Sequence, residues 1–169
     1  MEPLSIRWTS HSTQETRKLG AALGRLLQPG DFVALIGELG AGKTEFARGV
    51  AEGCSVPSDE VASPTFALLH RYRGRIPLLH ADLFRLAGEV DLYGTGYFEL
   101  RDSDEPAVVV EWADRIASAV PPDALRVHFA PGPGEGDRHL TATASGPISR
   151  RRLGEWANSL PGLAEREAP

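Results

Sequence analysis

The chain of 169 residues has a single cysteine, few lysines and no long apolar segment. Because Cys54 stands alone, an internal disulfide is excluded and a reducing compartment is favoured. No apolar run approaches the roughly 18 residues of a membrane-spanning helix, and no signal-peptide pattern is evident. We therefore expect a cytoplasmic protein with no membrane contact. The formal net charge of −5 argues against a large nucleic-acid footprint, although a partner could supply one.

Lysine is scarce, because only two of the 18 basic residues are Lys and the others are Arg. One of the two, Lys43, lies in GELGAGKT (37–44), which matches the phosphate-binding P-loop pattern G-x-x-x-x-G-K-[ST]. Glycines let backbone N–H groups approach a polyphosphate closely, and Lys43 would reach the β- and γ-phosphates. Thr44 would place its hydroxyl on Mg²⁺. A compact ammonium suits this role better than the wide guanidinium of Arg.

The segments around this loop have the pattern that a P-loop requires. An apolar run at 31–37 predicts a buried strand, and residues 43–54 follow at helical spacing. A further amphipathic helix is predicted over 12–27, with a capping box of Ser12 and Glu15 at its start. The predicted nucleotide-binding residues of the loop are Gly37, Glu38, Leu39, Gly40, Ala41, Gly42, Lys43, Thr44 and Glu45.

The rest of the chain predicts an α/β fold. Apolar runs at 66–72 and 75–83 predict an antiparallel strand pair, and 106–112 predicts another buried strand. We expect acidic helical or irregular structure over 84–105, a helix to about residue 120, a hairpin of 125–130 with 138–144, and a last helix over 148–160. In that helix, Arg150, Arg151 and Arg152 would form a solvated face or, as the less common alternative, contact RNA. The prediction is a single P-loop NTPase domain over 1–169, with a mixed parallel and antiparallel sheet flanked by helices, and a tail that frays from about residue 161.

Two acidic residues end predicted strands, Asp82 and Glu111. A P-loop NTPase needs such a carboxylate to hold Mg²⁺, although either one alone could be an ordinary strand-end acid held by water. The loop SPTF (63–66) follows the P-loop helix. It could direct the hydroxyl of Thr65 at the γ-phosphate or the metal, or it could be a plain turn. His80, inside a strand, is more often a satisfied core residue. The candidate catalytic residues are Lys43, Thr65, Asp82 and Glu111.

Together these motifs resemble the TsaE family, formerly YjeE, the ATPases of bacterial tRNA threonylcarbamoyladenosine synthesis. The resemblance runs from about residue 12 to residue 140. Many NTPases share the P-loop, whereas the other motifs at these separations are specific to the family. The matching motifs are GELGAGKT at 37–44, SPTF at 63–66, HADLFR at 80–85, GYFE at 96–99 and EW at 111–112.

The resemblance implies an ATP-hydrolysing enzyme in which Thr44 and Glu111 bind Mg²⁺. Asp82 would lie close to the metal and the γ-phosphate. Further nucleotide contacts are implied for Thr13, near the start of the first helix, and for Arg138, before the last strand. The chain departs from the family just after Thr44, where residue 45 is Glu and the family commonly has Thr or Ser.

The resemblance also implies that the protein works with partners. In the family, TsaD and TsaB transfer the threonylcarbamoyl group to the adenosine beside the anticodon of tRNAs that read ANN codons, and the ATPase resets this complex between turnovers. The tRNA would be held through the complex. None of Arg85, Arg101 and Arg138 stands out as a dedicated arginine finger, so we expect partners to stimulate hydrolysis. The acidic residues 89–105 are a candidate contact surface or else a solvated face.

Two other functions fit a P-loop protein of this size. A small-molecule kinase would need an acceptor pocket and an Arg-rich lid over the phosphates, and the sequence shows no convincing lid. A nucleotide-dependent binding switch would hold ATP with little turnover. A GTPase is disfavoured, because the guanine-specifying N-K-x-D motif is absent from the sequence.

Overall fold

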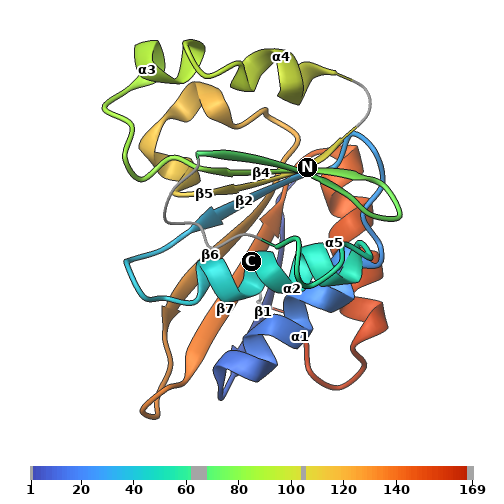
Figure 1. Cartoon of the computed structure of the whole chain (residues 1–169). Coiled ribbons are helices and arrows are strands. Elements are labelled where there is room, and N and C mark those ends of the chain that lie inside the picture. Colours follow the sequence, from blue (N-terminus) through green and yellow to red (C-terminus); the bar gives the residue numbers. More distant parts are fainter. Residues whose placement is uncertain (1, 62–67, 104–105, 167–169) are drawn as a thin grey trace.

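The fold is an eight-stranded sheet with helices on both faces (Figure 1). The computed structural model describes residues 2–61, 68–103 and 106–166. The strands are β1 (Leu4–Ser10), β2 (Phe32–Ile36), β3 (Leu69–Arg73), β4 (Pro77–Asp82), β5 (Ala107–Glu111), β6 (Leu125–Pro131), β7 (Arg138–Ala144) and β8 (Glu165–Arg166). The helices are α1 (Thr13–Gly24), α2 (Lys43–Gly53), α3 (Glu89–Tyr93), α4 (Tyr97–Asp102) and α5 (Pro147–Ser159), with 3₁₀ turns η1 (Ala113–Arg115) and η2 (Ala117–Ala119).

The sheet is parallel in its centre and antiparallel toward both ends. Its strand order is β3-β4-β5-β2-β6-β7-β1-β8, and β4, β5, β2 and β6 run parallel to one another. The predicted pairs β3–β4 and β6–β7 are antiparallel. Because parallel strands end at the same edge of a sheet, the carboxyl ends of β2, β4 and β5 meet there. Glu111 stands opposite both Leu35 and Asp82 at that edge.

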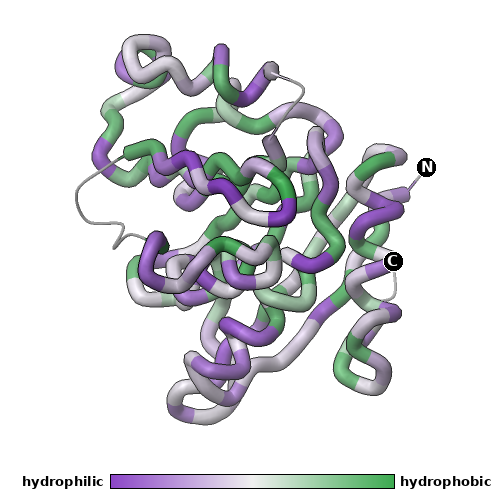
Figure 2. The backbone as a smooth tube through the Cα atoms, turned by 45° about the vertical axis from the view of Figure 1, so that its right-hand side comes forward, coloured by the Kyte–Doolittle hydropathy of each residue, from purple (hydrophilic) through white to green (hydrophobic). Residues whose placement is uncertain are grey.

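Two hydrophobic cores lie on the two faces of the sheet. The larger core lies under α1, α2 and α5, where the rings of Trp8 and Trp156 pack with centroids 4.1 Å apart. The smaller core lies under α3, α4 and the 3₁₀ turns. Figure 2 shows hydrophobic residues along the central strands and hydrophilic residues along the outer turns. In the part of the chain that the structure describes, no helix has the length and apolar character that crossing a membrane requires.

Three segments differ from the sequence-based expectation. Residues Leu4–Ser10 form β1, which was not predicted, and the side chains of Ile6, Trp8 and Ser10 alternate into the core. The helix expected up to residue 120 is instead two 3₁₀ turns, because Ile116 is extended between them, with φ −135°. Within the tail expected to fray, β8 pairs with β1.

Helices α1 and α2 pack backbone against backbone. Four glycines make this contact possible, spaced four residues apart on each helix: Gly20, Gly24, Gly49 and Gly53. A Cβ atom added to any of them would lie 2.0 to 2.2 Å from a carbonyl oxygen of the facing helix. That separation is far shorter than a van der Waals contact. The close approach fixes the start of α1 relative to the start of α2.

Replacing a contact glycine should therefore destabilise the protein. We expect Gly20→Ala to lower the free energy of unfolding by about 1–3 kcal/mol, because the methyl group must push the facing helix away. The matched control is Gly154→Ala in α5, where a Cβ would meet no atom of the described residues within 4 Å. That change should stabilise the protein by about 0.5–1 kcal/mol. Urea denaturation of both variants checks the prediction, and equal stability of Gly20→Ala and the wild type would contradict it.

Candidate functional site

The P-loop connects the carboxyl end of β2 to the first residue of α2. Gly40 and Gly42 have φ values of 79° and 106°, a conformation that favours glycine. Gly37 lies close to β6, since a Cβ there would be 2.9 Å from the carbonyl oxygen of Phe129. The N-cap residue of α2 is Gly42, which has no side chain to bind the N–H groups of the first turn, so these groups can bind an anion.

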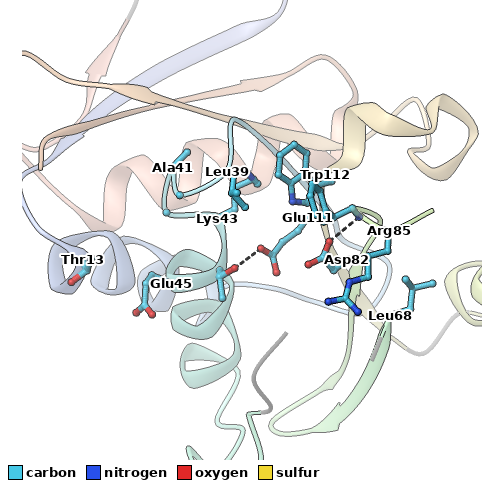
Figure 3. Close-up of a pocket in the computed structure, with 14 residues that line it drawn as sticks. Thr13, Leu39, Ala41, Lys43, Glu45, Leu68, Asp82, Arg85, Glu111 and Trp112 are labelled. Carbon is cyan, nitrogen blue, oxygen red and sulfur yellow. Dashed lines mark hydrogen bonds between the residues drawn. The ribbon is translucent and has the colours of Figure 1, made fainter. Parts of the chain in front are cut away.

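A cavity of about 570 Å³ opens over this loop. It extends from the start of α1, across α2, to the ends of β4 and β5 (Figure 3). The cavity is therefore large enough for a nucleotide-sized ligand. Its lining residues are Thr13, Leu39, Gly40, Ala41, Gly42, Lys43, Thr44, Glu45, Leu68, Asp82, Phe84, Arg85, Glu111 and Trp112.

The ammonium group of Lys43 is held inside the loop. Its Nζ donates hydrogen bonds to the carbonyl oxygen of Gly37 and, at 2.8 Å, to that of Glu38. It also lies 4.1 Å from the centroid of the Trp112 ring, a cation–π contact. Burial lowers the pKa of Lys43 from its ordinary value, and the nearby carboxylate of Glu111 opposes this shift. The loop thus holds a cation next to the first turn of α2.

Trp112 has an unusual backbone conformation for a large aromatic residue. Its φ of 57° lies in the left-handed region, which costs about 1–3 kcal/mol for such a residue. The turn follows Glu111 directly and brings the indole ring over Lys43 and against Phe84, at 4.9 Å between centroids. Backbone strain at this position therefore accompanies a specific placement of the ring at the cavity.

Glu111 is a buried carboxylate with a hydrogen-bond donor on each oxygen. Only 1% of the residue is exposed. Its Oε1 accepts the hydroxyl of Thr44 at 2.8 Å, and its Oε2 lies 2.7 Å from Nε2 of His80. Burial by itself would raise the pKa of Glu111, but the hydrogen bonds from His80 and Thr44 and the charge of Lys43 outweigh it and lower that pKa. The group is therefore ionised at neutral pH.

Asp82 lies beside Glu111 on the neighbouring strand. Its Oδ1 accepts the backbone N–H of Phe84 at 3.0 Å. Burial is the main cause that raises the pKa of Asp82, and the charge of Glu111 adds to it, while Phe84, His80 and Lys43 oppose it. Together with the Thr44 hydroxyl, the two carboxylates form a set of oxygen donors at one end of the cavity.

This donor set suits Mg²⁺. Mg²⁺ is commonly bound by one or two carboxylates, with water and phosphate oxygens as its other ligands. In residues 2–61, 68–103 and 106–166 no group of three or more His, Cys, Asp or Glu side chains surrounds a common metal position. A metal that requires an all-protein cage is therefore not indicated, and Thr44, Asp82 and Glu111 fit a metal that phosphate helps to hold.

The other end of the cavity is formed by the starts of α1 and α2. Thr13 and Glu45 lie there, well away from Asp82 and Arg85 (Figure 3). The carboxylate of Glu45 accepts a hydrogen bond from Arg48 at 3.2 Å. The close packing of the two helices explains why Thr13, thirty residues before Lys43, reaches the same cavity.

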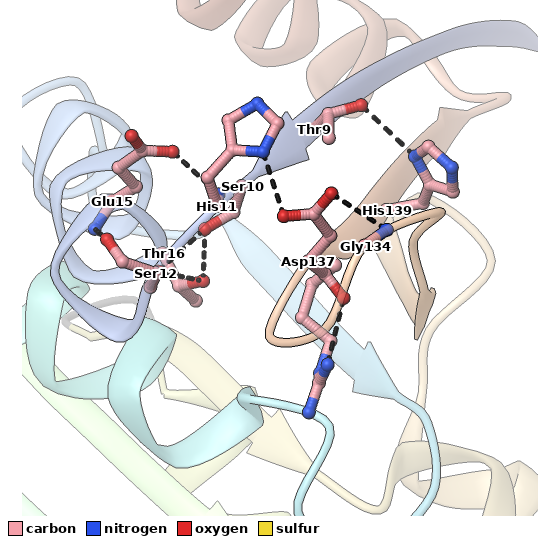
Figure 4. Close-up of polar contacts among 10 residues, drawn as sticks. Thr9, Ser10, His11, Ser12, Glu15, Thr16, Gly134, Asp137 and His139 are labelled. Carbon is pink, nitrogen blue, oxygen red and sulfur yellow. Dashed lines mark hydrogen bonds and ion pairs between the residues drawn. The ribbon is translucent and has the colours of Figure 1, made fainter.

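Polar contacts connect the start of α1 to the β6–β7 hairpin (Figure 4). Nδ1 of His11 lies 2.9 Å from a carboxylate oxygen of Asp137, and this hydrogen bond raises the pKa of His11 and lowers that of Asp137. Arg138 follows and donates to the backbone carbonyls of Asp137, at 2.8 Å, and of Gly40, at 3.4 Å. Arg138 thus touches the P-loop from outside the set of cavity-lining residues.

Most of the residues selected from the sequence come together in this site. Lys43, Thr44, Asp82, Glu111, Thr13, Glu45 and residues 39–42 all line the cavity, and the carbonyls of Gly37 and Glu38 bind Lys43. Thr65, with the rest of the SPTF motif, lies outside the described residues.

The three arginine candidates lie in different places. Arg85 lines the cavity. The guanidinium of Arg101 instead donates to the carbonyl of Ser118 at 2.8 Å and packs over the ring of Phe98. Arg101 therefore connects α4 to the 3₁₀ turn η2 and is not one of the residues that line the cavity.

Sequence reasoning missed four residues of the site. Leu68, Phe84 and Trp112 line the cavity, and His80 binds Glu111. The signal for three of them was present in the HADLFR and EW motifs. For Leu68 the sequence carries no comparable signal.

Comparison with known proteins identifies the relatives of this chain. A family model described as "Threonylcarbamoyl adenosine biosynthesis protein TsaE" matches residues 10–140. Two similar proteins are named tRNA threonylcarbamoyladenosine biosynthesis protein TsaE. The protein from Treponema pallidum is 42% identical to this chain, and the match covers 69% of this chain and 84% of that protein. The one from Bacillus subtilis is 34% identical and covers 83% of this chain and 87% of its own.

A solved structure is also similar over nearly the whole chain. The crystal structure of YdiB from Bacillus subtilis has a TM-score of 0.77 and 27% sequence identity to this chain. The match covers 94% of this chain and 97% of that one. These findings confirm the predicted family resemblance and the predicted α/β fold with a mixed sheet.

The hydrogen bond between Thr44 and Glu111 should contribute to the stability of the protein without ligand. Thr44→Val keeps the shape but removes the hydroxyl donor from a buried carboxylate. We expect a loss of about 1.5–3 kcal/mol in the free energy of unfolding. Thr44→Ser keeps the hydroxyl and should lose about 1 kcal/mol for one methyl group. Chemical denaturation in the absence of nucleotide distinguishes the two variants, and a Thr44→Val protein as stable as Thr44→Ser would contradict the assignment.

Proposed function

Because the chain belongs to the TsaE family, whose members are P-loop NTPases of tRNA threonylcarbamoyladenosine biosynthesis, we propose that it is a Mg²⁺-dependent ATPase of that pathway. The observation that carries the proposal is the contact of the P-loop hydroxyl of Thr44 with the strand-end carboxylate of Glu111, at 2.8 Å. In P-loop NTPases, a P-loop hydroxyl and a strand-end carboxylate hold Mg²⁺ together.

In this proposal each residue has a distinct task. The N–H groups of residues 39–44 bind the phosphates, and the Lys43 ammonium pairs with the β- and γ-phosphate oxygens. Thr44 and Glu111 hold Mg²⁺, and Asp82 orients the metal or the attacking water. Mg²⁺, when bound, neutralises charge on the phosphates. Thr13 and Arg138 contact the nucleoside side of ATP, and Thr65 directs its hydroxyl at the γ-phosphate.

We further propose that the protein acts with TsaD and TsaB and resets their complex between rounds of threonylcarbamoyl transfer to ANN-decoding tRNA. It would contact tRNA only through that complex, in the cytoplasm. Two of the three candidate arginines do not line the cavity, because Arg101 binds the carbonyl of Ser118 and Arg138 binds that of Gly40, which leaves Arg85 as the candidate at the site. A cation supplied by a partner would stabilise the transition state. The acidic residues of α3 and α4 are a candidate contact surface.

Lys43→Ala, which removes the ammonium group, should abolish productive ATP binding. Removing one partner of a buried charge pair costs roughly 2–5 kcal/mol, or on the order of 30- to several-thousand-fold in affinity. Lys43→Arg should fail nearly as badly, because a guanidinium is too wide for the position between two carbonyls and the indole ring. Calorimetric titration with ATP and Mg²⁺ measures both variants. Full binding by Lys43→Arg would show that the lysine has no special role.

Hydrolysis should depend on partners. We expect slow release of inorganic phosphate by the chain alone and acceleration by TsaD with TsaB. If these partners also tighten ATP binding, they must associate more tightly in ATP than in ADP, because coupling between two bound ligands is reciprocal. The measurement is ATPase rate against partner concentration, with pull-down in ATP, ADP and no nucleotide. Full activity of the chain alone would refute partner dependence. Transfer of label from ATP to a metabolite, in place of free phosphate, would indicate a kinase instead.

A further inference from the structure

The two oxygens of Glu111 have different partners. One oxygen accepts the hydroxyl of Thr44, on α2, and the other is bound by the imidazole of His80, on β4. The His80 and Glu111 side chains are 8% and 2% exposed, so water cannot easily replace either partner. The orientation of the carboxylate is therefore set by two protein groups on opposite sides of it.

The hydrogen bond also indicates which imidazole nitrogen is the donor. An ionised carboxylate can only accept hydrogen bonds, so Nε2 of His80 carries the proton that it shares with Glu111 at 2.7 Å. The ring has a neighbour behind it, because His70 on β3 stands opposite His80 and their ring centroids are 6.1 Å apart. His80 thus presents one nitrogen to the carboxylate from a packed position between two strands.

We propose that His80 is a positioning residue for the magnesium site: it holds Oε2 of Glu111 so that Oε1 stays directed at Thr44 and the metal. The inference rests on the proposed Mg²⁺-dependent function. His80 would not touch the metal or the nucleotide. Without it, the carboxylate can rotate, and both of its oxygens compete for the Thr44 hydroxyl and the metal. Groups that orient a metal ligand in this way typically contribute 10- to 100-fold to metal affinity.

The chain allows a sharp comparison of two amide variants. In His80→Gln, the amide nitrogen lies at about the position of the imidazole Nε2 and can donate to Glu111. In His80→Asn, the side chain is one methylene shorter, and its nitrogen occupies about the position of Nδ1. The two variants have the same polar group and differ in which imidazole nitrogen they replace. His80→Ala removes both nitrogens, and Glu111→Ala serves as a reference for loss of the ligand itself.

The experiment measures binding of ADP by calorimetry, in EDTA and over a series of Mg²⁺ concentrations. In EDTA, we expect the affinity of His80→Ala and His80→Asn for ADP to lie within about twofold of the wild-type affinity. The Mg²⁺ concentration at which Mg²⁺ changes their ADP affinity should be roughly 10- to 100-fold higher than in the wild type. His80→Gln should return the Mg²⁺ requirement to near the wild-type value. Thermal unfolding without ligand shows which variants fold. If His80→Ala does not fold, the comparison of His80→Gln with His80→Asn tests the positioning role of His80.

Two outcomes would overturn the inference. One is a wild-type Mg²⁺ requirement in both His80→Asn and His80→Gln. The other is weakened ADP binding to an equal degree with and without Mg²⁺, which indicates a structural role of His80. Neither outcome affects the proposed ATPase, which has its own test in the wild type. Conversely, a wild-type protein that binds Mg²⁺ with ADP but does not hydrolyse ATP would refute the ATPase and leave the role of His80 standing.

Discussion

The buried charge of Glu111 is the constraint on which the arrangement of the site depends. A carboxylate that is 1% exposed is very unfavourable unless donors surround it. The donors come from two other elements, the hydroxyl of Thr44 on α2 and the imidazole of His80 on β4, and the ammonium of Lys43 adds a nearby positive charge. Through these contacts the carboxylate of Glu111 connects β5 to β4 and to the start of α2. The P-loop lies where these elements meet.

A second constraint fixes the opposite wall of the cavity. The glycines of α1 and α2 allow direct backbone contact between the helices. Thr13, at the start of α1, is thereby held at a constant distance from the first turn of α2. The His11–Asp137 contact adds a connection from this end to Arg138 on β7. The two ends of the cavity thus have different origins, a charge network at one and close-packed backbones at the other.

The sequence predicted which residues lie around the cavity better than it predicted the contacts between them. The P-loop has a fixed spacing, and acids at the ends of buried strands are visible as a change from apolar to charged residues, so Lys43, Thr44, Asp82 and Glu111 could be selected. His80 and Trp112 could not be assigned a role in this way. A histidine in a strand is ambiguous until its partner is known, and the left-handed turn at Trp112 has no glycine to indicate it. Strand β1 could not be predicted either. The alternation of Ile6 and Trp8 is short, and β1 is recognised as a strand by its pairing with β7, which is distant in the sequence.

The contacts of two arginines show how guanidinium groups of this chain differ from the ammonium of Lys43. Arg152, expected on a solvated face, is buried and binds Asp31 through Nε at 2.6 Å, and Arg75 spans two carbonyls, at 3.0 and 2.7 Å. Arg152 also donates through Nη1 to Glu155, so its acceptors are spread around the planar group. In Arg75 a single nitrogen, Nη2, donates to both carbonyls. At Lys43 two carbonyls and the indole ring surround one nitrogen. An ammonium has three donors, so it retains one for phosphate oxygens after binding both carbonyls. The compact position between the carbonyls and the indole ring, together with the third donor, therefore favours lysine here.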